Sequence, residues 1–108
     1  MKKLILVLVL VGMLATSVFA DAFNIVNSTN STFFYVYVSD SRLSNWGDDL
    51  LGNQVLSPRE TLRVTTPIPI GSTTWDIRII DDDGDTYTVY NRRIRDGESI
   101  NVTYDDLD

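Results

Sequence analysis

One stretch, residues 75–90, restricts the fold of this chain more than any other; it reads W-D-I-R-I-I-D-D-D-G-D-T-Y-T-V-Y. Two runs of β-branched and aromatic residues flank an Asp/Gly turn, which is typical of a β-hairpin. A two-residue loop would mix polar and apolar side chains on both faces. A three-residue loop, residues 82–84, separates them, with Gly84 in a left-handed conformation. It predicts one apolar face made of Trp75, Ile77, Ile79, Tyr87 and Val89.

Four aspartates crowd the tip of this hairpin: Asp81, Asp82, Asp83 and Asp85. Like charges repel at close range, so we expect something to offset the repulsion among these carboxylates. Solvent and salt, an arginine from the cluster at positions 92, 93 and 95, or a bound cation are the alternatives.

Calcium is the cation that suits several hard carboxylate oxygens. Asp81, Asp83 and Asp85 alternate along the chain, but the spacing does not match an EF-hand loop. A complete calcium shell would need help from a second loop, for which Asp48 and Asp49 are the candidates.

The first twenty residues have the pattern of a secretory signal peptide. Lys2 and Lys3 precede an apolar run, and Val18 and Ala20 offer small residues at the −3 and −1 positions for cleavage after Ala20. We therefore expect a domain of residues 21–108 that is periplasmic or secreted, and no membrane association after cleavage. The chain contains no cysteine, which excludes a lipid-anchored lipoprotein.

The predicted domain is acidic. Both lysines lie in the predicted signal peptide, which leaves seven arginines against 15 acidic residues and a net charge of −8. This charge argues against nucleic acid as a partner and favours a cation or a basic protein surface. We expect a monomer.

The rest of the chain alternates short apolar runs with turns. Strands are expected at residues 23–26, 32–39, 61–65 and 99–104, in addition to the hairpin. A single helical turn is expected around Leu50 and Leu51, and a frayed acidic tail at residues 105–108. Pro67 and Pro69 indicate a crossing between sheets. The pattern predicts an all-β fold, a small antiparallel Greek-key β-sandwich of six to seven short strands.

Three aromatic residues are candidates for binding. The strand at residues 32–39 is apolar on both faces, so we expect it to be central, or its Tyr35 and Tyr37 to lie at a partly covered face. The two tyrosines are structural in one interpretation and stack on a ligand such as a sugar in the other. Trp46, in the longest irregular segment, either closes the end of the core or serves as an exposed recognition residue.

Two motifs carry a resemblance. W-G-D-D-L-L-G at residues 46–52 and W-D-I-R-I-I-D-D-D-G-D-T-Y-T at residues 75–88 resemble those of an uncharacterised family of small exported bacterial β-proteins. The family pattern has W-G-x-D-L-L, a Pro-Gly-Glu turn and x-D-I-R-V-V-D-x-D-G-D. The resemblance implies a fold and an exported location, and it implies no activity. Arg59 stands where the family turn has glycine.

The composition limits the possible chemistry. Residues 21–108 contain no His, Cys or Lys, which removes thiol nucleophiles, imidazole bases, Schiff-base lysines and the usual zinc ligands. We therefore expect that the protein is not an enzyme. The first expectation is a non-catalytic structural or interaction module of the envelope or the extracellular space. The alternatives are a calcium-binding β-domain and an acidic inhibitor or ligand of a basic protein.

Overall fold

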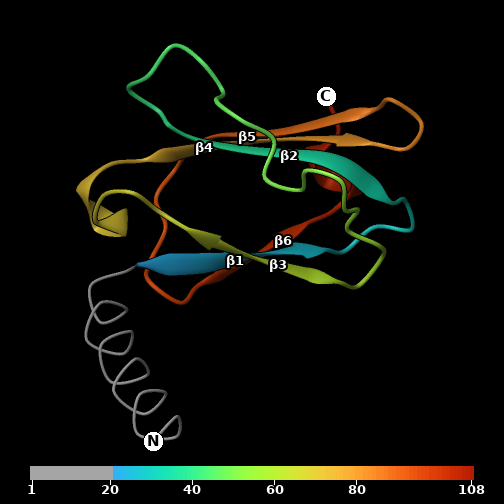
Figure 1. The fold of residues 1–108 in the computed structure, drawn as a ribbon, viewed down its shortest axis with the longest axis horizontal. Coiled ribbons are helices and arrows are strands. Elements are labelled where there is room, and N and C mark those ends of the chain that lie inside the picture. The colour runs from blue at the N-terminus through green and yellow to red at the C-terminus, as the bar shows by residue number, and fades with distance from the viewer. Residues whose placement is uncertain (1–20) are drawn as a thin grey trace, which may run out of the picture.

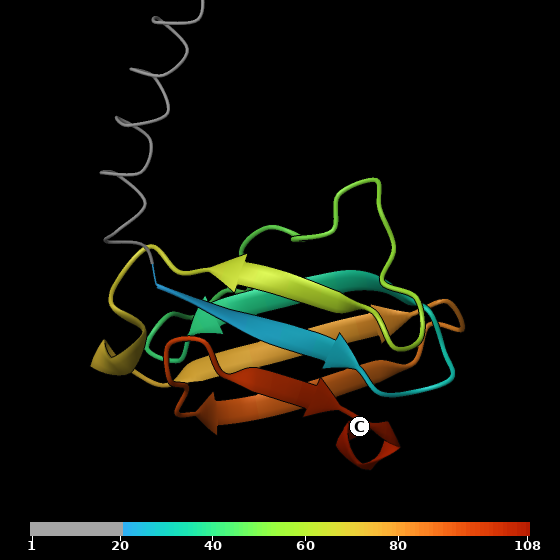
Figure 2. The ribbon, with the colours of Figure 1, turned by 90° about the horizontal axis from the view of Figure 1, so that it is seen from below.

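Six β-strands form two three-stranded sheets that lie face to face (Figures 1 and 2). The computed structural model describes residues 21–108, so the predicted signal peptide lies outside the described residues. One sheet has the order β3-β1-β6 and the other the order β2-β4-β5. The strands are β1 Ala22–Asn27, β2 Phe33–Asp40, β3 Thr61–Thr65, β4 Trp75–Asp81, β5 Thr86–Arg92 and β6 Ser99–Val102, with short 3₁₀ turns η1 Ile70–Ser72 and η2 Tyr104–Asp106. No helix within residues 21–108 is long and apolar enough to span a membrane.

The predicted hairpin is confirmed as β4 and β5. Ile77 pairs with Val89 and Ile79 with Tyr87, which is the register of a three-residue loop. Gly84 has φ +81°, and its amide donates to the Asp81 carbonyl at 3.0 Å. Four members of the predicted apolar face are buried, and Val89 is half-buried against them. Local alternation therefore predicts this part of the fold correctly.

The two sheets bury one continuous apolar core between them. Each strand contributes alternate residues to it, because side chains along a strand point to opposite faces. The most fully buried apolar side chains come from both sheets and, for Ile94, from the connection between β5 and β6; those of the sheets are Phe23, Ile25, Phe33, Val36, Ile77, Ile79, Tyr87 and Val102.

The expectation of an entirely antiparallel sandwich is wrong at one pair, since β1 and β6 run parallel. After β5 the chain crosses from one sheet to the other and enters the second sheet beside the start of β1. There the Gly97 amide donates to the Ala22 carbonyl at 2.7 Å, and the Ala22 amide donates to the Asp96 carboxylate at 3.0 Å. A strand that enters at the same end as its neighbour must run parallel to it.

Strand β2 lies at an edge of its sheet, whereas β4 is central, so the prediction of a central position for β2 is wrong. An irregular segment, residues 46–56, covers its outer edge. Leu50 donates to the Val36 carbonyl at 2.8 Å, and Phe33 and Leu56 exchange two backbone hydrogen bonds of 2.9 Å. The expected helical turn at Leu50 and Leu51 does not form, because this backbone follows the edge of β2 instead.

The acidic tail is ordered by hydrogen bonds, and the expectation that it frays is wrong. Leu107 forms a bridge with Tyr87, and the Asp108 amide donates to the Thr86 carbonyl at 3.0 Å. Hydroxyl hydrogen bonds from Thr88 and Thr86 lower the pKa of Asp108. The tail thus covers the outer edge of β5, so that both edges of the β2-β4-β5 sheet are partly protected from further pairing.

A polar network holds the turn after β1. Asn27 is fully buried, and its amide donates to the carbonyls of Ser31 at 2.8 Å and Leu56 at 3.0 Å. Its side-chain carbonyl oxygen accepts hydrogen bonds from the backbone amide and the hydroxyl of Thr29. Arg59 adopts φ +73°, a conformation that favours glycine, and its guanidinium donates to the Thr29 carbonyl at 2.8 Å. The turn therefore combines a backbone conformation that favours glycine with a side-chain contact from Arg59.

Candidate binding face

The outer faces of the two sheets differ in chemistry. In the β3-β1-β6 sheet, the residues that alternate with the core are mostly polar, with the half-buried Val26 as an apolar exception; the polar ones include Asn24, Arg63, Thr65, Ser99 and Asn101. Such a solvated face is ordinary for a sandwich. The outer face of the β2-β4-β5 sheet instead carries exposed aromatic side chains, which is the more informative observation.

The predicted residues Tyr35 and Tyr37 lie on this outer face, where they alternate with the buried Val36. Their rings are parallel within 6° at a centroid distance of 6.5 Å, and Tyr35 is 44% exposed. Tyr90 projects from the same face at the far end of β5 and is 62% exposed. The sheet therefore presents tyrosines from both of its outer strands.

Trp46 joins this group from the irregular segment after β2. Its ring lies 6.2 Å from that of Tyr90, tilted by 44°. The indole is half-buried and does not belong to the buried core, although it lines an apolar cavity of about 230 Å³ together with Trp75 and Ile68. Trp46 thus covers one end of the core with one face and meets Tyr90 with another part of its surface.

A second, smaller cavity lies between Trp46 and Tyr90. Its volume is about 180 Å³, and its remaining lining is mostly polar: Ser39, Leu43, Ser44, Asn45 and Asp76. We call it the Trp46–Tyr90 cleft. Asp76 is fixed there, because one of its carboxylate oxygens, Oδ1, accepts from the Ser41 hydroxyl at 2.6 Å and from the Asn91 amide at 2.8 Å.

A β-bulge shapes this end of the hairpin. The register of β4 and β5 shifts between Trp75 and Ile77, and Asn91 has φ +53°. Bulges bend a strand and re-aim its side chains. The bulge turns the Asn91 amide toward Asp76 and so connects β5 to the cleft.

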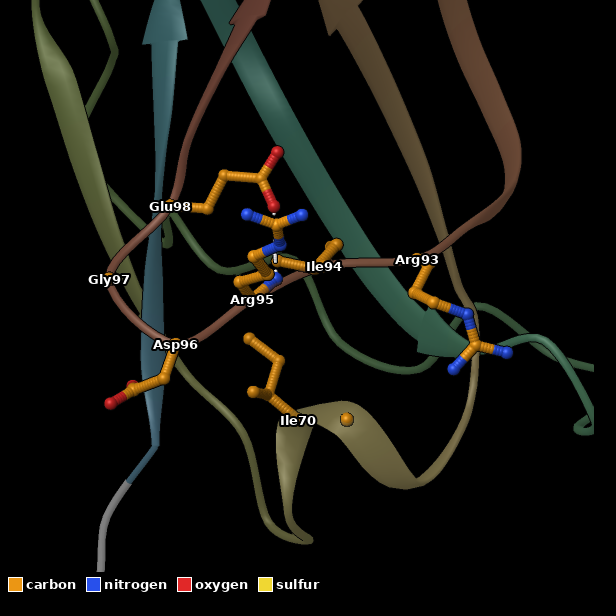
Figure 3. A pocket seen from close by; sticks show the side chains of 8 residues that line it. Ile70, Arg93, Ile94, Arg95, Asp96, Gly97 and Glu98 are labelled. Carbon is orange, nitrogen blue, oxygen red and sulfur yellow. Dashed lines mark hydrogen bonds between the residues drawn. The ribbon is translucent and has the colours of Figure 1, made fainter.

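An open cavity of about 980 Å³ lies at the start of β6 (Figure 3). It combines Arg93 and Arg95 with Asp96 and Glu98, and Arg93 points away from the other charged groups. Hydrogen bonds from the Arg95 amide and the Arg92 guanidinium lower the pKa of Glu98. The charged side chains that line this cavity are of both signs, so the cavity favours no single class of ligand.

The acidic tip is built around one buried carboxylate. Asp81 is 3% exposed, and its Oδ1 accepts from the amides of Asp83 and Asp85, each at 2.9 Å. Its Oδ2 accepts from the Tyr87 hydroxyl at 2.9 Å. Asp81 therefore has a structural role in closing the loop.

The structure brings together Asp81, Asp83 and Asp85, with one carboxylate oxygen from each within 4.8 Å of the others. Asp48 and Asp49 do not belong to this group among the described residues. Asp49 accepts from the amides of Val36, Leu51 and Gly52 and so organises residues 46–52, while Asp48 is exposed.

The arginine alternative for the tip is wrong. Arg92 pairs with Glu98 at 2.7 Å, at the end of β5 opposite the tip. Repulsion, first from Asp82 and then from Asp81, raises the pKa of Asp83. The charge of the tip is thus not balanced by an arginine of the described chain.

Replacing Asp83 by asparagine is expected to raise Tm by a few degrees at neutral pH and low salt. The raised pKa of the Asp83 carboxyl means that stability falls as the pH rises through that pKa, so the gain disappears in acid and in high salt. Thermal melts measure it, with the exposed Asp48→Asn as the matched control. A bound calcium ion predicts the reverse: added calcium would stabilise the natural protein, and Asp83→Asn would abolish that gain.

Alkaline pH is expected to destabilise the fold through Tyr87. Burial first, and the hydrogen bond to Asp81 second, raise the pKa of Tyr87 from 10.0 to about 12. The stabilisation is complete below pH 10 and is lost as the pH rises from 10 toward 12, because the folded state holds the proton more tightly. The loss amounts to about 2 to 3 kcal/mol. Urea unfolding at pH 8 and at pH 12 measures it; Tyr87→Phe should flatten the pH dependence and the exposed Tyr90→Phe should not.

One solved structure has the same fold. An NMR structure of a protein from Eubacterium rectale superposes with a TM-score of 0.60, covering 82% of this chain and 84% of the other, at 14% sequence identity. At this identity the similarity shows the fold alone. No protein-family model matches the chain, and no curated protein sequence does either.

The sequence indicates Trp46, Tyr35 and Tyr37 as candidate binding residues, but it does not indicate Tyr90 or Asp76. For Tyr90 a signal exists, since it continues the outward alternation of Thr86 and Thr88 on β5. Asp76 has no comparable signal, because its role depends on contacts with Ser41 and Asn91, which lie on distant segments.

Proposed function

We propose that this chain is an exported, non-catalytic interaction module whose binding surface is the outer face of the β2-β4-β5 sheet. The observation that carries the proposal is the gathering of Tyr35, Tyr37, Trp46 and Tyr90 on that face. Tyrosine and tryptophan are the residues that contribute most to binding surfaces, since they offer large contact area with a polar group. The outer face of the β3-β1-β6 sheet, in contrast, is mostly polar and carries no aromatic side chain on its strands.

Two features of the sequence support the export part of the proposal. Residues 1–20 have the pattern of a signal peptide, and the motifs at residues 46–52 and 75–88 resemble those of small exported bacterial proteins. The absence of His, Cys and Lys from residues 21–108 supports a binding rather than a catalytic role.

Site-specific photo-crosslinking in the producing cell tests the proposal. A benzophenone amino acid replaces Tyr90 in one variant and Thr65, on the outer face of the other sheet, in the control. We expect defined covalent adducts from position 90 and none from position 65. Equal labelling from both positions, or none from either, would overturn the assignment of the binding face.

The two alternatives stay predictions. An acidic ligand of a basic protein would use the exposed aspartates at the hairpin tip, and salt-dependent binding to a cationic protein would reveal it. A calcium-binding role is tested by the melting experiments on Asp83→Asn.

A further inference from the structure

We infer that the Trp46–Tyr90 cleft binds one ring of a neutral saccharide and that Tyr37 and Tyr35 receive the following rings of the same glycan chain. The inference rests on the proposed function and names the class of ligand. It is carried by the shape of the cleft, its aromatic walls, and one fixed carboxylate oxygen that has no hydrogen-bond partner within residues 21–108.

The cleft has room for a single small ring. Its volume of about 180 Å³ corresponds to about six water molecules. Pockets for drug-sized ligands or cofactors are larger, about 300 to 1,000 Å³. A pyranose ring displaces several waters and exposes both apolar C–H groups and hydroxyls, which suits a small cleft of mixed polarity.

The two walls are aromatic. Trp46 and Tyr90 approach one another at 6.2 Å with a tilt of 44°, so their rings form an open angle rather than a closed stack. Aromatic rings offer a flat apolar surface with negative charge on the face. The polarised C–H groups of a sugar ring pack well against such a surface.

The polar groups of the cleft suit hydroxyls. Asp76 Oδ1 is occupied by Ser41 and Asn91, whereas within the described chain its Oδ2 has no hydrogen-bond partner. The hydrogen bonds to Oδ1 hold the whole carboxylate in position, so Oδ2 can accept a hydrogen bond from a ligand hydroxyl. The exposed amide of Asn45 can both donate and accept beside it.

Charge argues for a neutral ligand. Residues 21–108 carry a net charge of −8, which disfavours anionic glycans. On the face itself, Arg78 follows Asp76 on β4 with the same outward orientation. A neutral, hydroxyl-rich polymer is not repelled by this net charge, and its hydroxyls can donate to the Asp76 carboxylate.

The tyrosines continue the site along β2. Tyr37 lies two residues before Ser39, which lines the cleft, and Tyr35 lies two residues further. Outward residues on one strand repeat at about 6.6 Å, and the two tyrosine rings are 6.5 Å apart. This spacing is of the size of one sugar unit, so a linear glycan can contact the cleft and both tyrosines at once.

Titration of the ¹⁵N-labelled domain with neutral hexasaccharides tests the inference; the probes are the hexamers of glucose, xylose and N-acetylglucosamine. We expect one of them to shift the Trp46 indole and the amides around Asn45, Asp76 and Tyr90. Trp46→Ala or Asp76→Asn should weaken binding at least tenfold. Tyr35→Ala should weaken the binding of the hexasaccharide more than the binding of the corresponding disaccharide. Arg63→Ala, on the other sheet, should leave binding unchanged.

The outcomes separate the two proposals. If no hexasaccharide shifts these signals while crosslinking from position 90 traps a protein, the saccharide inference is overturned and the binding face stands. If hexamer binding is unaffected by Trp46→Ala, the cleft is excluded as its site. Well-dispersed spectra of the variants ensure that a loss of binding is not a loss of folding.

Discussion

Replacing Asn27 by alanine is expected to lower the free energy of unfolding by about 3 to 4 kcal/mol. The side chain is fully buried and makes four hydrogen bonds, two as donor and two as acceptor. Alanine would leave the buried Thr29 amide without its acceptor and weaken the contacts of the Ser31 and Leu56 carbonyls. Each buried polar group that loses its partner costs about 1 to 3 kcal/mol.

Asn24 provides the matched control, since it lies on the same strand but points outward. Asn24→Ala should change the free energy of unfolding by less than about 1 kcal/mol. Urea unfolding followed by tryptophan fluorescence measures both variants. Similar values for the two would contradict the role assigned to the buried network.

The second large effect is expected at the centre of the hairpin. Ile77→Ala should lower the free energy of unfolding by about 2 to 5 kcal/mol, because it removes buried volume between the two sheets. Ile77 is 1% exposed and belongs to the core. Its neighbour Arg78 points outward, where Arg78→Ala should cost less than about 1 kcal/mol.

The same unfolding experiment measures the two hairpin variants. Their ratio tests the register directly, because a shift by one residue would exchange the faces of Ile77 and Arg78. Equal losses, or a larger loss for Arg78→Ala, would show that the faces have been assigned wrongly.

The sequence predicts those parts of the fold that local alternation decides. The hairpin register follows from a pattern within residues 75–90, and Gly84 marks its loop. The parallel pairing of β1 with β6 leaves no such pattern, since it depends on where a distant connection enters the sheet. Likewise, the covering of β2 by residues 46–56 arises from backbone hydrogen bonds, which side-chain periodicity does not encode.

The candidate site follows the same division. Exposed aromatic residues can be recognised in a strand that is apolar on both faces, which is why the sequence indicates Tyr35 and Tyr37 as candidates. Polar residues were harder to interpret. Asp81 and Asp49 carry carboxylates, which are typical calcium ligands. In the folded chain, however, both carboxylates accept hydrogen bonds from backbone amides.

The pairing of the first strand with the last also governs how the chain reaches its native state. β1 is the central strand of its sheet, and one of its two partners, β6, ends at Val102. During vectorial synthesis the second ladder of β1 therefore cannot form until the chain has been made as far as Val102. Such non-local topology slows folding to milliseconds or seconds, and it prolongs the time in which the nascent chain remains extended. Loss of β6 would thus deprive β1 of one of its two neighbours in the sheet.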